Sequence, residues 1–283
     1  MLRHGMKQIH LFCVSSTACI LAMLVACGPS PDPHDPTDVE LGETTFVVVV
    51  NPTINDLNDV AVPEPGEVVA DVSIDGGGQS VVTGTEGVGV LGGVDAGAVA
   101  LTFHSGAIDV DLTESIAEQD LVELAVSVTP DGASRMARVV YAFGAEVVEL
   151  AADSTIEQVN DALSASDRIV LLSDGVYTGD LELSGSSVTL FGAGTLGGRV
   201  TIEGNVTVSG SDNRIRGAHI TGDLDMSGSN AGLSFSTIDG DVTVSGSDSV
   251  LLQNTFCGLV DIGGSGTYAL GNLGMAPLTH SCP

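Results

Sequence analysis

The sequence predicts an all-β protein in which a small antiparallel β-sandwich is followed by a short parallel β-helix with a capping helix at its N-terminal end. Two observations carry this prediction. Residues 44–150 consist of short apolar or alternating runs separated by Gly, Pro, Asp and Asn, a pattern typical of antiparallel sandwiches. In residues 151–283, units punctuated by glycine recur, with GDLDMSGSN at 222 echoed by GDVTVSGSD at 240. Such a repeat indicates stacked units that bury their apolar sides only against their neighbours.

Residues 1–27 have the features of an export signal. They contain Arg3 and Lys7, no acidic residue, and an apolar run, LFCVSSTACILAM, that is too short for a membrane-spanning helix. Their last residues, LVAC, resemble the lipobox of bacterial lipoproteins. The resemblance implies that Cys27 is diacylated and anchors the chain in the bacterial cell envelope, and Gly28, where an aspartate would retain the protein at the inner membrane, implies the outer membrane. An ordinary secretory signal with a cysteine near its cleavage site is the alternative.

Residues 28–43 separate this signal from the body of the chain. The stretch GPSPDPHDPTDVELG contains four prolines and four acidic residues. Prolines favour extended polyproline II conformations and like charges repel, so we expect a semi-rigid stalk that holds the folded part away from the membrane.

The charge of the chain restricts its partners. All 37 acidic residues follow Cys27, together with only six arginines and no lysine, so the exported chain has a net charge of −31. Such a field repels nucleic acid, whose binding needs clustered Lys and Arg. Two explanations stay open: adaptation to a salty environment that screens self-repulsion, or carboxylates that bind calcium. We favour the first and expect no metal and no cofactor, because no stretch has the alternating acidic spacing of a calcium loop.

Two cysteines remain after the signal and the lipidated Cys27 are set aside. They are Cys257 and Cys282, an even pair in an exported chain, which predicts a disulfide. The disulfide would tie the C-terminal tail to the last repeat. Two unpaired thiols are the alternative.

The predicted sandwich spans residues 44–150, and its segment Asp71–Phe103 has a recognisable order of features. A strand, a glycine turn, Thr83-Gly84 with Glu86-Gly87, a second strand, a turn at 93–97 and the strand around Leu101 follow one another. This order resembles the carboxypeptidase-regulatory, transthyretin-like family. The resemblance implies a structural or adhesive domain without catalysis of its own. We expect His104, which follows on an alternating strand, to face solvent.

The predicted β-helix spans residues 151–283 and opens with a helix. Ser154 is the expected N-cap, with Glu157 as its capping-box partner, and an apolar stripe at helical spacing continues the helix to about residue 165. A buried strand, IVLL, and the turn Gly175-Val176-Tyr177 follow. Helix, strand and turn in this order resemble the opening of pectate-lyase-like right-handed β-helices. The resemblance implies a right-handed parallel β-helix capped by this helix.

The repeat positions define the expected coils. Glycines at 179, 198, 222, 240 and 258 each open a unit, and the longer interval before Gly222 predicts a bulged coil around 205–210. About six coils fit before Gly274, with Asn254 and Asn272 in an internal asparagine stack. A calcium-binding β-roll with nine-residue repeats is the rival architecture, but only half of each unit has its glycine pattern. The expected inward positions are Ile215, Leu233 and Leu251; Ile220, Ile238 and Phe256; and Leu224, Met226, Val242, Val244, Val260 and Ile262.

Inward apolar residues place acidic residues on the outside of the coils. Asp223 and Asp241 then lie on neighbouring coils roughly 4.8 Å apart, and Asp225 and Asp261 form another outward column. We also expect an acid–base–acid ladder in which Arg199 lies between Asp180 and Asp223. A glycosidase needs two carboxylates about 5–9.5 Å apart, which these columns could supply.

Other features weigh against an enzyme. Trp is absent and Tyr is rare, although sugar sites favour aromatic faces, and lysine is absent from the coils. We therefore predict a non-enzymatic, membrane-anchored surface lipoprotein with a structural, adhesion or envelope-interaction role. Its partners would be the membrane, through the lipid, and an envelope or extracellular glycan or protein. The alternatives are a carbohydrate-active enzyme, either a polysaccharide lyase or a glycoside hydrolase acting through Asp223, Asp241 and Arg199, and a calcium-stabilised binding module.

Overall fold

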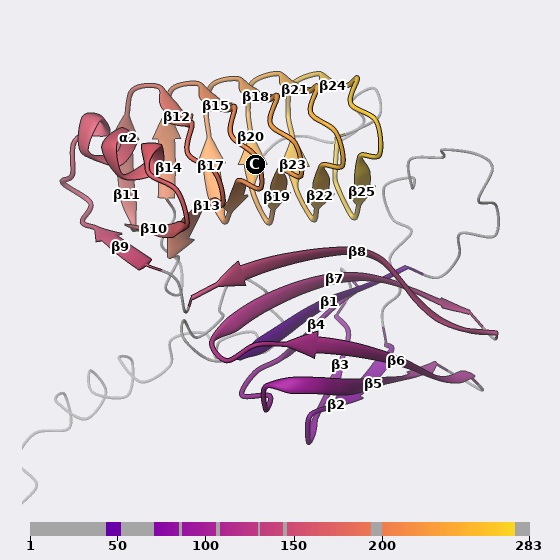
Figure 1. Cartoon of the computed structure of the whole chain (residues 1–283). Helices are drawn as coiled ribbons and strands as arrows, with labels where there is room; N and C mark the ends of the chain where they lie inside the picture. The colour runs from indigo at the N-terminus through magenta and orange to yellow at the C-terminus, as the bar shows by residue number, and fades with distance from the viewer. Residues whose placement is uncertain are drawn as a thin grey trace, which may run out of the picture. The chain divides into compact units, whose positions relative to one another are not determined.

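The computed structural model describes residues 44–51, 71–84, 87–105, 108–129, 131–143, 146–193 and 200–274 (Figure 1). In these ranges the chain forms a mainly antiparallel β-sandwich and a right-handed parallel β-helix with one helix, α2 (Ile156–Ser164), beside the first coil. The fold class predicted from the sequence is confirmed. Searching these same ranges finds no helix long and apolar enough to cross a membrane.

The sandwich consists of two four-stranded sheets. The inner sheet has the order β4 (Val88–Leu91), β1 (Thr45–Asn51), β7 (Asp120–Thr129), β8 (Gly132–Ala142). The outer sheet has the order β3 (Gln79–Val82), β2 (Ser73–Gly76), β5 (Gly97–Ser105), β6 (Ile108–Ile116). All strand pairs are antiparallel except β1 with β7, which run parallel from Thr45 opposite Leu121 to Asn51 opposite Ser127.

The two strands of the parallel pair, β1 and β7, are buried on both faces, as their nearly continuous apolar sequences indicate. On one face Val48 and Leu124 belong to the apolar core between the two sandwich sheets. On the other face Val47 and Ala125 belong to a second apolar cluster that includes Phe191 of the β-helix. The inner sheet therefore lies between the outer sheet and the β-helix.

The β-helix stacks its strands into three parallel sheets (Figure 1). The first faces the sandwich and has the order β9 (Glu146–Leu150), β10 (Arg168–Ser173), β13 (Val188–Ala193), β16 (Arg214–Arg216), β19 (Gly232–Ser234), β22 (Val250–Leu252), β25 (Tyr268–Leu270). The second contains β11 (Gly175–Thr178), β14 (Val200–Glu203), β17 (Ala218–Ile220), β20 (Thr237–Ile238) and β23 (Thr255–Phe256). The third contains β12 (Leu181–Leu183), β15 (Val206–Val208), β18 (Leu224–Met226), β21 (Val242–Val244) and β24 (Val260–Ile262).

The expected inward positions form the core of the coils. Leu224, Val242 and Val260 lie opposite one another on successive coils, and the first two are almost fully buried. The predicted asparagine stack is confirmed, since Asn254 Nδ2 donates to Asn272 Oδ1 at 2.9 Å inside the helix. The described residues hold five complete coils and the start of a sixth, in agreement with the predicted number.

The predicted position of the longer coil is wrong. Residues 205–210 contain the regular strand β15, whose Val206 and Val208 are buried and pair with β12 and β18. The extra residues fall between β13 and β14 instead. β10 pairs with β13 at an offset of 20 residues, Arg168 opposite Val188, whereas β11 pairs with β14 at an offset of 25, Gly175 opposite Val200.

This shift also changes one member of the glycine column. The repeat position above Gly179 is Gly204 rather than Gly198, because a Cβ added to Gly204 would lie 2.2 Å from the carbonyl oxygen of Gly179. Gly222, Gly240 and the following repeat continue the same column.

Two element boundaries also differ from the prediction. The N-cap of α2 is Thr155 rather than Ser154: its hydroxyl accepts from the backbone N–H of Gln158, whose side chain accepts from the backbone N–H of Thr155. Gln158 thus takes the place expected for Glu157. Residues 146–150, assigned to the sandwich by sequence, form β9, which pairs with β10 of the β-helix. The reason is burial, because Val148 and Leu150 pack on the core of the coils.

Candidate functional site

The carboxylates predicted as alternative catalytic residues cap the backbone of the coils. Asp223 Oδ1 accepts from the backbone N–H of Asp241 at 2.8 Å, and Asp241 Oδ1 accepts from that of Leu259 at 2.9 Å. One coil earlier, Asn205 Oδ1 accepts from the N–H of Asp223 at 2.9 Å. Since an amide serves as well as a carboxylate in this column, the position requires an oxygen acceptor and not an acid.

The predicted ladder of Asp180, Arg199 and Asp223 is wrong. Asn205 lies between the two aspartates, because its own backbone N–H donates to Asp180 Oδ1 at 2.8 Å. Arg199 lies outside the described residues. The second outward column is confirmed: Asp225 and Asp261 are exposed on the third sheet, separated by Thr243.

The predicted cysteine modifications fall largely outside the described chain. Cys27 and Cys282 lie outside it, while Cys257 follows β23. Both the lipidation and the disulfide therefore stay predictions. Within the ranges that the structure describes, no group of three or more His, Cys, Asp or Glu side chains is placed to hold a metal ion.

His104 on the outer sandwich sheet lies between two carboxylates. Its Nδ1 is 2.7 Å from Asp109 Oδ1, and its Nε2 is 3.0 Å from Asp75 Oδ2. Asp109 lies directly opposite His104 on β6, and Asp75 lies diagonally on β2, which is why the three side chains meet. The side chain is 39% exposed, so the predicted surface position is correct, but the sequence pattern did not indicate the two acids.

The two acids change the titration of this cluster. The hydrogen bond with Asp109, followed by that with Asp75, raises the pKa of His104 above its usual value of 6.5. The pKa of Asp75 is lowered, first by a hydrogen bond from Ser80 and further by His104. With both ring nitrogens facing carboxylates, the doubly protonated imidazolium is the favoured form, because it donates on both sides.

A pH dependence of stability follows from this raised pKa. The folded state binds the proton more tightly than the unfolded chain, so the stabilisation is complete below about pH 6.5. It is lost as the pH rises through the higher pKa of the folded state. We expect His104→Gln to abolish this part of the pH dependence, measured as the melting temperature from pH 5.5 to 9. A variant with the same decline across this window as the parent would contradict the assignment.

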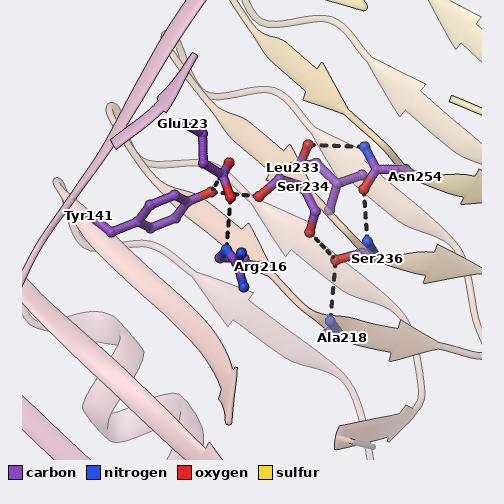
Figure 2. Close-up of polar contacts among 8 residues, drawn as sticks. All are labelled: Glu123, Tyr141, Arg216, Ala218, Leu233, Ser234, Ser236 and Asn254. Atoms are coloured by element: carbon purple, nitrogen blue, oxygen red, sulfur yellow. Dashed lines mark hydrogen bonds and ion pairs between the residues drawn. The ribbon is translucent and has the colours of Figure 1, made fainter. Parts of the chain in front are cut away.

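A buried polar network connects the sandwich to the β-helix (Figure 2). Arg216 of β16 donates from Nε to Glu123 Oε1 of β7 at 2.7 Å. Tyr141 of β8 donates to Glu123 Oε2 at 3.0 Å, and its oxygen lies 2.6 Å from the hydroxyl of Ser234 on β19. All four residues are almost fully buried. This arrangement, which we call the joint, consists of Glu123, Tyr141, Arg216 and Ser234.

Aromatic rings and a desolvated phenol complete the joint. The guanidinium of Arg216 lies 5.1 Å from the ring centroid of Phe191 and 4.9 Å from that of Phe235, within the range of cation–π attraction. Burial first, and the nearby charge of Glu123 second, raise the pKa of Tyr141 well above its usual value. The phenol therefore keeps its proton and donates it to Glu123.

The joint continues into the ladder inside the coils (Figure 2). The backbone carbonyl of Ser234 accepts from the Ser236 hydroxyl at 2.9 Å. The backbone N–H of Ser236 in turn donates to Asn254 Oδ1 at 3.0 Å. All of these groups are buried, and their hydrogen bonds connect the sandwich to the β-helix.

The joint was not predicted from the sequence, although two features of the sequence pointed to it. Glu123 is the one acid within the apolar run LVELAVSV of β7. Arg216 follows the inward Ile215, so alternation puts it on the outer face of the coil, which the sequence pattern assigns to solvent. The inner sandwich sheet covers that face. Because its strands are distant from Arg216 in the sequence, the local pattern does not show that the face is buried.

A cavity of about 280 Å³ lies near the joint, between β8 and the first sheet of the β-helix. Its apolar wall consists of Val140, Ala142 and Ile169. Its polar lining consists of two arginines, two aspartates and two hydroxyl residues: Arg168, Arg214, Asp167, Asp212, Ser187 and Thr189.

Comparison with known proteins assigns no relative to this chain. A scan against family models, a search of curated proteins and a search of solved structures found no match.

Proposed function

We propose that this protein is a non-enzymatic surface lipoprotein with a structural, adhesion or envelope-interaction role. In this proposal Cys27 carries the lipid, residues 28–43 form the stalk, and the sandwich and β-helix together form one rigid body that the stalk presents. The single observation that carries the proposal is the buried joint, in which Glu123 and Arg216 bind each other across the two modules at 2.7 Å.

The joint supports a scaffold because it resists sliding. A buried ion pair has one favourable geometry, and separating its partners leaves an uncompensated charge in the interior. An apolar cluster surrounds it, in which Val139 and Tyr141 of β8 pack with Leu252 and Leu270 of the β-helix. Modules connected only by a flexible linker would move independently, whereas these two share a core.

The outer faces of the coils support the same proposal. The aspartates that could have acted on a sugar, Asp223 and Asp241, are engaged as caps for the next coil. Together with Asn205 they hold the coils in register. The exposed carboxylates that remain then serve solubility in a strongly acidic chain.

The anchor is tested by metabolic labelling. Cells that express the full chain with labelled palmitate should yield labelled protein in the membrane fraction. Cys27→Ala should lose the label and leave the membrane fraction. Failure of the parent to take up label, or equal labelling of the variant, would overturn the lipid anchor.

The absence of catalysis is tested with a panel of acidic and neutral polysaccharides. We expect the purified protein to release neither reducing ends nor unsaturated sugars. The double variant Asp223→Asn/Asp241→Asn is the matched control, because asparagine keeps the oxygen that caps the backbone, as Asn205 does, and should fold normally. Product release by the parent that this variant abolishes would overturn the proposal in favour of a carbohydrate-active enzyme.

A further inference from the structure

We propose that the cavity between β8 and the first sheet of the β-helix binds a small zwitterion, namely an α-amino acid with an apolar side chain. The carboxylate of the ligand pairs with Arg214, its ammonium lies near Asp167 and Asp212, and its side chain packs on Ala142 and Ile169. This inference is independent of the lipid anchor and of the scaffold role.

The positive side of the site is the guanidinium of Arg214. In the part of the chain that the structure describes, Arg214 is the one arginine without an ion pair; its Nη1 donates instead to the backbone carbonyl of Asp212. The other arginines reach carboxylates: Arg135 and Arg138 with Glu114, Arg168 with Glu146, and Arg216 with Glu123. In a chain with 37 acidic residues, a half-buried guanidinium that pairs with no carboxylate is unexpected.

A carboxylate is the ligand group that such a guanidinium recognises. The planar fork of arginine matches the two oxygens of a carboxylate, and partial burial strengthens the pair. The Nε atom of Arg214 is covered from solvent and makes no hydrogen bond within the described residues, so a donor remains to be used. Arg168 lines the same cavity, but Glu146 at 3.0 Å already neutralises it.

The negative side of the site favours a zwitterion over a simple anion. Asp167 and Asp212 line the cavity, and only one of them has a side-chain partner among the described residues, the amide of Asn230 at 3.3 Å from Asp212 Oδ1. The net charge of −29 creates a field that repels anions. A zwitterion has no net charge, so it escapes this field and still engages both local signs.

Size and wall chemistry define the rest of the ligand. The cavity of about 280 Å³ is close to the lower limit of about 300 Å³ for ligand pockets, which suits a monomer and not a polymer. Ala142 and Ile169 provide apolar lining for a side chain such as that of valine. Val140 also lines the cavity, but its side chain packs on the core of the sandwich. Ser187 and Thr189 add hydroxyls that can bind the carboxylate or the ammonium.

Calorimetric titration of the folded chain tests the proposal with three matched probes. L-Valine carries both charges, isovalerate lacks the ammonium, and isobutylamine lacks the carboxylate. We expect valine to bind and each truncated probe to bind at least about tenfold more weakly. No heat with valine, alanine or leucine overturns the site, and isovalerate as tight as valine reduces it to a plain carboxylate site and overturns the zwitterion.

Two variants separate the site from folding. Arg214→Gln should weaken valine binding at least about tenfold, whereas Arg135→Gln, which removes the same charge on the sandwich, should bind as the parent does. If Arg214→Gln fails to fold, Ala142→Leu adds bulk to the lining of the cavity at an exposed position of the edge strand β8, without changing any charge. Valine binding that survives Ala142→Leu unchanged would overturn the location.

Discussion

Arg216→Met is expected to lower the free energy of unfolding by about 3–5 kcal/mol, because it leaves Glu123 buried without its counter-charge. Glu123 is fully buried, and its remaining partner in the joint is the neutral phenol of Tyr141. Methionine keeps an apolar stem between Phe191 and Phe235, so the lost charge dominates the effect over lost packing. Urea denaturation followed by circular dichroism measures the change.

Two comparisons identify the cause of this loss. The double variant Glu123→Leu/Arg216→Met should recover most of the stability, since replacing both members of a buried pair by apolar residues is nearly neutral. Arg168→Met breaks a more exposed pair with Glu146 and should cost only about 0–1 kcal/mol. If Arg216→Met costs no more than Arg168→Met, the joint does not hold the modules together.

The sequence predicted the coils well because their signals are local and repeated. Within a coil, alternation fixes which residues point inward, so Leu224, Met226, Val242 and Val244 could be placed before the structure was known. Because the coils stack, the same type of residue recurs at the same position of successive coils, as with Asn254 and Asn272. Errors arose where the period breaks. The glycine at 198 fitted the spacing by chance, because the inserted residues before β14 shift the register.

The joint could not be predicted by the same reasoning. Arg216 and Glu123 are 93 residues apart, and no periodic pattern connects a sandwich strand with a coil. The sequence shows only that an acid interrupts a buried strand and that an arginine lies on the outer face of a coil. Which side of the coil the sandwich covers depends on packing between modules. The N-cap error is smaller: Ser154 and Thr155 have equivalent hydroxyls, and only the backbone geometry selects Thr155.

Gly246→Ala is expected to lower the free energy of unfolding by about 3 kcal/mol, through a clash between coils. A Cβ at this position would lie 1.9 Å from the backbone carbonyl oxygen of Gly228, one coil earlier. Neither atom can move freely, because the strands on both sides are hydrogen-bonded to their neighbours, with Met226 opposite Val244. Glycine is required here for its lack of a side chain. Thermal and urea denaturation measure the loss.

Gly263→Ala is the matched control, since a Cβ at that position meets no atom within 4 Å. It lies next to Gly264, the following member of the same column, and should change the free energy of unfolding by no more than about 0.5 kcal/mol. Gly228→Ala should behave like Gly246→Ala, because its Cβ would lie 2.0 Å from the carbonyl oxygen of Gly210. Equal tolerance of alanine at 246 and 263 would mean that the coils can separate locally. In that case the glycines of this column would not be required by the close approach of successive coils.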